Sequence, residues 1–215
     1  MKRSLVVLSA IAMFAFAAQA QAAGDMYAGV KAGVNIANVG GSDAPDNTSS
    51  RTGFQGGLFI GKHVNDQFGF RVEGLYVQKG AKGKASSSSS SSSDVTEKLD
   101  YIEFPILFVY DIKNTEKMGF NLFAGPTLGF NMSAKVESTD IKDNIQSFEF
   151  GGAIGAGVEK KMAGGKAITF DARYSMGATT VAKDVTVAST TVSPDIKNRG
   201  FGFMLGYQIP IGSSQ

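Results

Sequence analysis

The sequence contains no cysteine and no tryptophan, and its 215 residues include only one histidine and five prolines. Without thiol sulfurs the chain has no disulfide bonds, no cysteine-ligated metal site and no cysteine nucleophile. Charged residues are also scarce, at 19%, whereas there are 27 glycines and 16 phenylalanines. Because the glycines follow no three-residue period and apolar residues are plentiful, the composition argues against collagen and disorder and indicates a glycine-rich all-β protein.

Residues 1–22 have the pattern of a secretory signal peptide. Lys2 and Arg3 precede an apolar stretch over 5–18, and small residues suited to cleavage follow. This stretch is shorter than the roughly 20 apolar residues of a membrane-spanning helix. We therefore expect residues 23–215 to form the mature domain. The signal peptide carries two of the 21 basic residues, so the mature chain has 19 basic and 19 acidic residues and is formally neutral. We therefore expect no nucleic-acid binding.

Apolar residues recur at every second position in the mature chain, which is the period of a strand with two different faces. From Met26 to Ile36, for example, every even position is apolar, whereas the odd positions are mostly small or polar. This alternation predicts eight strands, within 26–36, 54–61, 68–76, 101–110, 120–132, 148–158, 168–176 and 201–209.

The connections between these strands alternate in length. Those near 38–51, 81–97, 134–145 and 181–197 are long, whereas 63–67, 111–118 and 160–166 are short. This is typical of an up-and-down outer-membrane barrel, in which long loops face outside, short turns face the periplasm and both termini are periplasmic.

A soluble lipocalin-type barrel would also alternate, so the composition of the polar face decides between the two. A solvated exterior would be dense in Lys, Glu and Thr, but this face is mostly Gly with isolated charges, which suits a narrow interior. We therefore predict an all-β, eight-stranded antiparallel up-and-down transmembrane β-barrel in the outer membrane of a Gram-negative bacterium, with its apolar face in the lipid bilayer.

Two features depart from the regular pattern. Pro105 and Pro126 fall in mid-strand and lack the N–H that a ladder needs, so we expect a bulge or a local break at each. Leu75 and Val77 break the alternation of their strand, which predicts that this end of the strand rises above the bilayer.

Several strings resemble a known family. They are Tyr27–Asn35, Leu75–Lys82, Leu99–Leu107, Phe120–Gly129 and Asp171–Gly177. Together they are similar to the PorT-like outer-membrane β-barrel family (porin family) common in Bacteroidetes. The resemblance covers essentially the whole mature chain and includes both prolines. It implies the barrel fold and the outer-membrane location. Because PorT itself is linked to protein secretion and many relatives have no assigned role, it implies no single activity.

Seven charged residues fall on the inward face of the predicted strands. In a narrow lumen of low dielectric, opposite charges pair, because a charge left unpaired there costs several kcal/mol. We expect a salt-bridge network that fills the lumen, and the alternative is the lining of a small ion pathway. The seven residues are Lys31, Arg71, Glu73, Glu103, Glu149, Asp171 and Arg173.

The chain offers little for catalysis or for binding a cofactor. His63, the only histidine, falls in a short predicted turn that gives a catalytic base no fixed scaffold. Glu149 and Asp171 could serve as an acid–base pair only beside a cleft that is open to substrate. We therefore predict a protein that is not an enzyme and has no cofactor and no metal.

The outward loops and the last strand suggest partners. The serine run 86–93 predicts a solvated tether, whereas Val181–Val192 favours β structure with an edge to which another protein could add a strand. Gly202–Tyr207 resembles the closing signal read by the outer-membrane assembly machinery, which implies transient binding to that machinery and to periplasmic chaperones. We expect a structural or interaction role; the alternative is transport, as a narrow pore or as an accessory barrel of a protein-secretion system.

Overall fold

The computed structural model describes residues 26–45, 48–85, 93–187 and 190–211, so the expected signal peptide lies outside the described residues. Eight long strands dominate the molecule. They are β1 (Met26–Gly40), β2 (Thr48–His63), β3 (Phe68–Lys79), β5 (Ser93–Asn114), β6 (Met118–Val136), β8 (Phe148–Lys161), β9 (Ala167–Gly177) and β12 (Lys197–Pro210).

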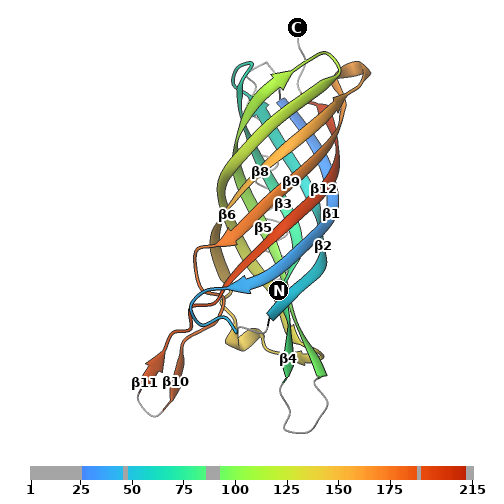
Figure 1. Ribbon diagram of the computed structural model, residues 1–215. Helices are drawn as coiled ribbons and strands as arrows, with labels where there is room; N and C mark the ends of the chain where they lie inside the picture. The colour runs from blue at the N-terminus through green and yellow to red at the C-terminus, as the bar shows by residue number, and fades with distance from the viewer. Residues whose placement is uncertain (1–25, 46–47, 86–92, 188–189, 212–215) are drawn as a thin grey trace, which may run out of the picture.

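These eight strands form a closed barrel. Each pairs antiparallel with its neighbour in the order β1, β2, β3, β5, β6, β8, β9, β12, and β12 pairs back with β1. Figure 1 shows the strands tilted around a common axis, with the short turns at the top and the long loops at the bottom. The predicted eight-stranded up-and-down barrel is therefore confirmed.

The apolar face of the alternation points outward. On β1, the side chain of Val30 is 53% exposed, whereas that of its neighbour Lys31 is 3% exposed. The same contrast holds on the other long strands, where exposed Phe, Leu and Ile alternate with buried polar residues. Side chains on a strand alternate between its two faces. Because the outward face of every long strand is apolar, these faces together form a continuous apolar belt around the barrel.

Glycines on the inner face make room for aromatic rings. A Cβ added at Gly29 would lie 2.5 Å from Cζ of Phe59, and one added at Gly61 would lie 2.2 Å from Cζ of Tyr27. The rings of Phe59 and Tyr27 therefore lie against the backbone of the neighbouring strand, where a larger residue would push them away.

The two mid-strand prolines interrupt ladders without shifting them. Between β3 and β5 the pairing stops after Val72↔Ile106 and resumes in the same register at Leu75↔Glu103, beside Pro105. Between β5 and β6 the described pairs likewise skip the position opposite Pro126. The bulges occur elsewhere, between Asp100 and Tyr101 and between Asp111 and Lys113. The expectation of a bulge or a local break at each proline is therefore confirmed, in the form of a local break.

The inner face of β3 continues unbroken through Leu75 and Val77. Both side chains are buried and form a small apolar cluster with Met204 of β12. The two residues thus keep the inward side of the strand, and the expectation that this end of the strand rises above the bilayer stays a prediction. The lumen at this level is mixed, because Leu75 is directly opposite buried Glu103 and Val77 borders the same gap as Lys79.

The β structure expected within Val181–Val192 is present, and two other long connections contain short elements that the sequence pattern did not predict. The strand β4 (Ala81–Ala85) pairs with β2 and β5, and β10 (Val185–Val187) pairs with β11 (Thr190–Val192) in a separate two-stranded sheet. Figure 1 shows this hairpin standing clear of the barrel. The remaining short elements are β7 (Thr139–Asp140), η1 (Lys142–Asn144) and η2 (Ala163–Gly165). No helix in the described part of the chain is long and apolar enough to cross a membrane.

Contacts between the long loops close the loop-side mouth of the barrel. Ile145, which follows η1, bridges to Ala182 and packs into a buried cluster with Leu99, Tyr101 and Ala134. Gln146 N–H donates to the carbonyl of Val181 at 2.8 Å, which ties the loop after β6 to the loop after β9. We call Leu99, Tyr101, Ala134 and Ile145 the apolar plug, because they fill the lumen beneath the loops.

Candidate functional site

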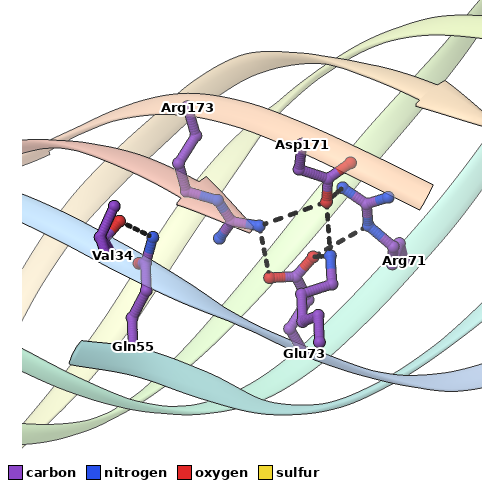
Figure 2. Close-up of polar contacts among 7 residues, drawn as sticks. Val34, Gln55, Arg71, Glu73, Asp171 and Arg173 are labelled. Carbon is purple, nitrogen blue, oxygen red and sulfur yellow. Dashed lines mark hydrogen bonds and ion pairs between the residues drawn. The ribbon is translucent and has the colours of Figure 1, made fainter. Parts of the chain in front are cut away.

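The centre of the lumen holds a cluster of five charged side chains, which we call the central charge cluster: Lys31, Arg71, Glu73, Asp171 and Arg173. They come from β1, β3 and β9, and all are buried. Glu73 accepts hydrogen bonds from Lys31 Nζ at 2.8 Å and from Arg173 Nη2 at 2.7 Å, and it forms an ion pair with Arg71 Nε at 2.9 Å. Asp171 contacts Lys31 Nζ at 2.5 Å and Arg71 Nη2 at 3.1 Å. Figure 2 shows these side chains converging across the lumen.

Aromatic rings flank the cations of this cluster. Lys31 Nζ lies 4.5 Å from the ring centroid of Phe59, and Arg71 Cζ lies 4.6 Å from that of Phe123. Arg173 Cζ lies 5.5 Å from the Phe123 centroid. Cations over ring faces are attracted by the negative face of the ring, so Phe59 and Phe123 supplement the two carboxylates.

A second group, nearer the long loops, forms what we call the outer charge cluster: Lys79, Glu103 and Glu149. Lys79 Nζ lies 2.5 Å from Glu103 Oε1 and 2.7 Å from Glu149 Oε1. Asn198 donates to the other oxygen of Glu149 and, at 3.4 Å, to the hydroxyl of Tyr101. The outer charge cluster therefore meets the apolar plug at Tyr101.

Little space remains between the two clusters. The gap bordered by Arg173 of the central cluster and by Lys79 and Glu103 of the outer cluster holds about 10 Å³. That is at the lower limit of what a single water molecule occupies. In the described structure, the lumen at this level is filled by side chains.

All seven charged residues expected in the lumen point inward, but they divide between the two clusters. Five of them make up the central cluster, and Glu103 and Glu149 belong to the outer one. The sequence interpretation missed Lys79, which joins those two carboxylates, because the predicted strand stopped at residue 76. Lys79 has the same parity as Arg71 and Glu73, so continuing the alternation would have found it.

His63 is better ordered than the sequence pattern suggested. It is the last residue of β2, outside the turn in which it was expected, and its Nδ1 lies 3.3 Å from Oδ2 of buried Asp111. Its ring lies 5.0 Å, between centroids, from that of Tyr27. The expectation of a mobile turn residue was wrong, because β-pairing and Asp111 hold the imidazole in place.

A cavity of about 450 Å³ opens at the short-turn end of the barrel, beside His63. Its wall includes Tyr27, Glu159 and Lys166, together with residues of all three short turns. We call it the periplasmic vestibule. It does not reach the central cluster, whose charged residues are absent from its described wall.

The described residues offer no clear catalytic or metal site. Glu149 and Asp171, considered as an acid–base pair, belong to different clusters and each contacts a lysine. No group of three or more His, Asp or Glu side chains in the described ranges could hold a metal ion. The charged side chains in the lumen are arranged to block it by pairing with one another.

Comparison with known proteins identifies the family. The model of the Outer membrane protein beta-barrel domain family matches residues 17–182, which is more than half of the chain. No curated protein matches the sequence.

Solved structures show the same fold at low sequence identity. The outer membrane protein OprG from Pseudomonas aeruginosa has a TM-score of 0.52 and 10% identity, over 88% of this chain and 98% of OprG. Neisserial surface protein A (NspA) has a TM-score of 0.48 and 18% identity, over 89% and 100% of the two chains. The outer membrane enzyme PagL is also similar, with a TM-score of 0.41 and 14% identity, over 86% and 99% of the two chains. The chain therefore belongs to the Outer membrane protein beta-barrel domain family and is an integral β-barrel protein of the bacterial outer membrane.

Proposed function

We propose that this protein is a non-enzymatic, non-conducting outer-membrane barrel that acts through its exposed loops. The filled lumen carries this proposal. The central charge cluster crosses the interior, and the outer charge cluster and the apolar plug lie between it and the long loops. Since an eight-stranded barrel is just wide enough for its own side chains, a chain of ion pairs across it leaves no water-filled path.

The exposed hairpin β10–β11 is the part of the loops best suited to a protein partner. Its two strands pair only with each other among the described strands, so neither has a second described strand along its outer edge. Such an edge can accept an added strand from another chain. The proposed partner therefore presents an extended segment at the cell surface.

Planar-bilayer recording tests the non-conducting part of the proposal. The protein is folded in detergent, and the shift of its gel mobility on heating verifies the closed barrel before reconstitution. We expect no unitary currents from the wild-type protein. Steady unitary currents at a range of voltages would show that the clusters leave a path for ions and would contradict the proposal.

A transport role is the second candidate, as a narrow pore or as an accessory barrel of a protein-secretion system. The periplasmic vestibule favours it, because a cavity of about 450 Å³ faces the compartment from which cargo would come. The resemblance to the PorT-like family of Bacteroidetes agrees with an accessory role. A silent barrel whose deletion lowers the amount of secreted protein would support the accessory role, and unitary currents would support the pore.

We also propose that β12 carries the signal for the assembly machinery and for periplasmic chaperones. Phe203 and Tyr207 point outward on this last strand, with exposed fractions of 38% and 41%. The variants Phe203→Asp and Tyr207→Asp should assemble poorly in cells. Phe150→Asp on β8 is the matched control, because it places the same charge on the apolar belt. If the β12 variants assemble as well as this control, the signal does not lie at Phe203 and Tyr207.

A further inference from the structure

Two deeply buried side chains of the periplasmic vestibule have polar groups that the rest of the described protein does not use. Tyr27 and Gln208 are 5% and 7% exposed, and both line this cavity. Neither the Tyr27 hydroxyl nor the Gln208 amide forms a hydrogen bond with a described residue, and neither belongs to the described polar atoms that are sealed from solvent without a partner. Both polar groups therefore reach the open space of the vestibule.

These two side chains are neighbours on the inner face of the barrel. Strand β1 pairs with β12 so that Tyr27 is opposite Pro210, and Gln208 is opposite Gly29. Such diagonal neighbours lie about 7–8 Å apart, a distance that long side chains can bridge. The ring of Tyr27 lies over Gly61 of β2, where an added Cβ would be 2.4 Å from the hydroxyl oxygen. The missing Cβ at Gly61 therefore leaves room for the hydroxyl in the wall of the vestibule.

Glu159 adds a carboxylate to the same cavity. It is half-buried on the inward side of β8 and forms no ion pair with a described residue. Four charged groups act on it from a distance, and they already form two pairs. His63 Nδ1 lies 3.3 Å from Asp111 Oδ2, and Arg71 Nη2 lies 3.1 Å from Asp171 Oδ2. Glu159 is therefore left without a cation of its own.

The vestibule as a whole carries more acid than base. Its described wall has three carboxylates against two lysines, so one negative charge is in excess. His63 also lines the cavity, but its imidazole lies beside buried Asp111, and this pair adds no net positive charge. The five charged residues of the wall are Asp66, Glu116, Glu159, Lys161 and Lys166. The cavity is therefore better matched to a small cation than to an anion.

We infer that the periplasmic vestibule binds a primary alkylammonium group. An ammonium has three N–H donors and no acceptor. The wall offers three kinds of acceptor to it: the Glu159 carboxylate, the Gln208 carbonyl oxygen and the Tyr27 hydroxyl oxygen. Met26 and Met162 border the same cavity, and their thioether side chains can pack against the methylene groups of the ligand.

The same chemical group has two sources, because it occurs in free aliphatic amines and at the end of lysine side chains in peptides. The volume of about 450 Å³ has room for either. The inference goes beyond the proposed function and does not depend on whether the lumen conducts, because the vestibule does not reach the central charge cluster.

Nuclear magnetic resonance of the isotope-labelled mature protein, folded in detergent, tests the inference. The side-chain amide signal of Gln208 reports binding at the vestibule itself. The probes are aminopentanol, the neutral pentanediol of the same length, and the quaternary analogue of aminopentanol, in which methyl groups replace all three N–H hydrogens. A lysine derivative with both backbone ends blocked represents the peptide source.

The test variant is Glu159→Gln, which keeps the shape of the side chain and removes its charge. The matched control is Asp184→Asn, which removes a carboxylate from an exposed long loop at the other end of the barrel. Gel mobility, heated and unheated, verifies that each variant folds.

We expect aminopentanol to shift the Gln208 signal saturably in the wild type and in the control. Loss of a hydrogen bond between charged groups weakens binding by at least about tenfold, so Glu159→Gln should bind at least about tenfold more weakly. The diol and the quaternary analogue should bind more weakly than aminopentanol. Tighter binding of the blocked lysine than of aminopentanol would support a peptide source, and the reverse order would support a free amine.

Three results would each overturn the inference. The first is a Gln208 signal that none of the amines moves. The second is equal affinity of Glu159→Gln and the wild type for aminopentanol. The third is equal affinity of the wild type for aminopentanol and for either the diol or the quaternary analogue, because the N–H donors would then not be recognised.

Discussion

The central and outer charge clusters share one lumen but are built in opposite ways. The central cluster sets three cations against two carboxylates and surrounds them with the rings of Phe59 and Phe123. The outer cluster sets a single ammonium, that of Lys79, between two carboxylates and adds the amide of Asn198. One cluster therefore has an excess of positive charge and the other an excess of negative charge.

The excess charges of the two clusters, one positive and one negative, cancel when the clusters are taken together. The two clusters border the same small gap, so their opposite excess charges attract each other across a region with little water. A buried charge whose partner is removed is strongly destabilising, whereas a complete network is nearly neutral in free energy. Substitutions that remove a single charge should therefore have large effects, which differ between the clusters.

The largest effect is expected for Glu73→Ala. Glu73 forms ion pairs with Lys31, Arg71 and Arg173, so its loss leaves three cations with only Asp171. We expect the free energy of unfolding to fall by about 3–5 kcal/mol. Urea unfolding in lipid vesicles, followed by far-UV circular dichroism because the chain has no tryptophan, measures it. Glu116→Ala, in an exposed short turn, is the control and should change stability by less than about 0.5 kcal/mol.

A smaller loss is expected for Lys79→Met. It leaves Glu103 and Glu149 without their shared cation, although Asn198 still donates to Glu149. We expect a loss of about 3 kcal/mol in the same assay. Adding Glu103→Gln should restore part of it, because it removes one of the two uncompensated charges. If the double variant loses as much free energy of unfolding as the two single variants lose together, the outer cluster is not a coupled unit.

The inward position of these charges could be predicted from the sequence, because the side-chain period of a strand is fixed at two. Alternation alone placed Lys31, Arg71 and Asp171 on the inner face. It did not reveal their partners, because pairing across the lumen depends on strand tilt and register. The contact between Lys31 and Asp171, 140 residues apart, is a product of barrel closure.

The ends of the strands were predicted less well than their middles. The predicted strand ended before Lys79, and Asp111 was assigned to a connection, yet both are buried inside the barrel. At the strand ends, alternation competes with turn-forming residues, and the sequence pattern does not show where pairing stops. The loop contacts around Ile145 were also missed, because they join segments that are far apart in the chain.

Tyr101→Phe should have a smaller effect than either charge variant. It removes the hydroxyl that accepts from Asn198 at 3.4 Å, while the ring stays 4.8 Å from Lys79 Nζ. Because Asn198 still donates to Glu149, we expect a loss of at most about 1 kcal/mol in urea unfolding. A loss as large as that of Lys79→Met would mean that the neutral groups, and not the ammonium, hold the outer cluster together.

The smallest effect should occur outside the lumen, where Asp195 joins two long loops. Asp195 contacts Lys197 Nζ at 2.6 Å and accepts from Ser42 N–H at 3.3 Å. The hydrogen bond from Lys197 and, to a smaller extent, the hydrogen bond from Ser42 lower the pKa of the Asp195 carboxyl below its ordinary value. A lowered folded-state pKa means that the contact is complete above the ordinary carboxyl pKa near 4 and is lost as the pH falls through the lowered value.

Asp195→Asn should therefore loosen this loop contact at neutral pH without changing the unfolding of the barrel. Hydrogen exchange at the Ser42 amide, corrected for the intrinsic rate, measures it. We expect faster exchange in the variant at pH 7, and in the wild type only when the pH falls below about 4. Asp184→Asn, an exposed residue of the same long loop, is the control and should leave the Ser42 amide unchanged. Equal protection of this amide in Asp195→Asn and wild type would show that backbone contacts alone, such as Asp43 N–H to the carbonyl of Asp195, hold the loops together.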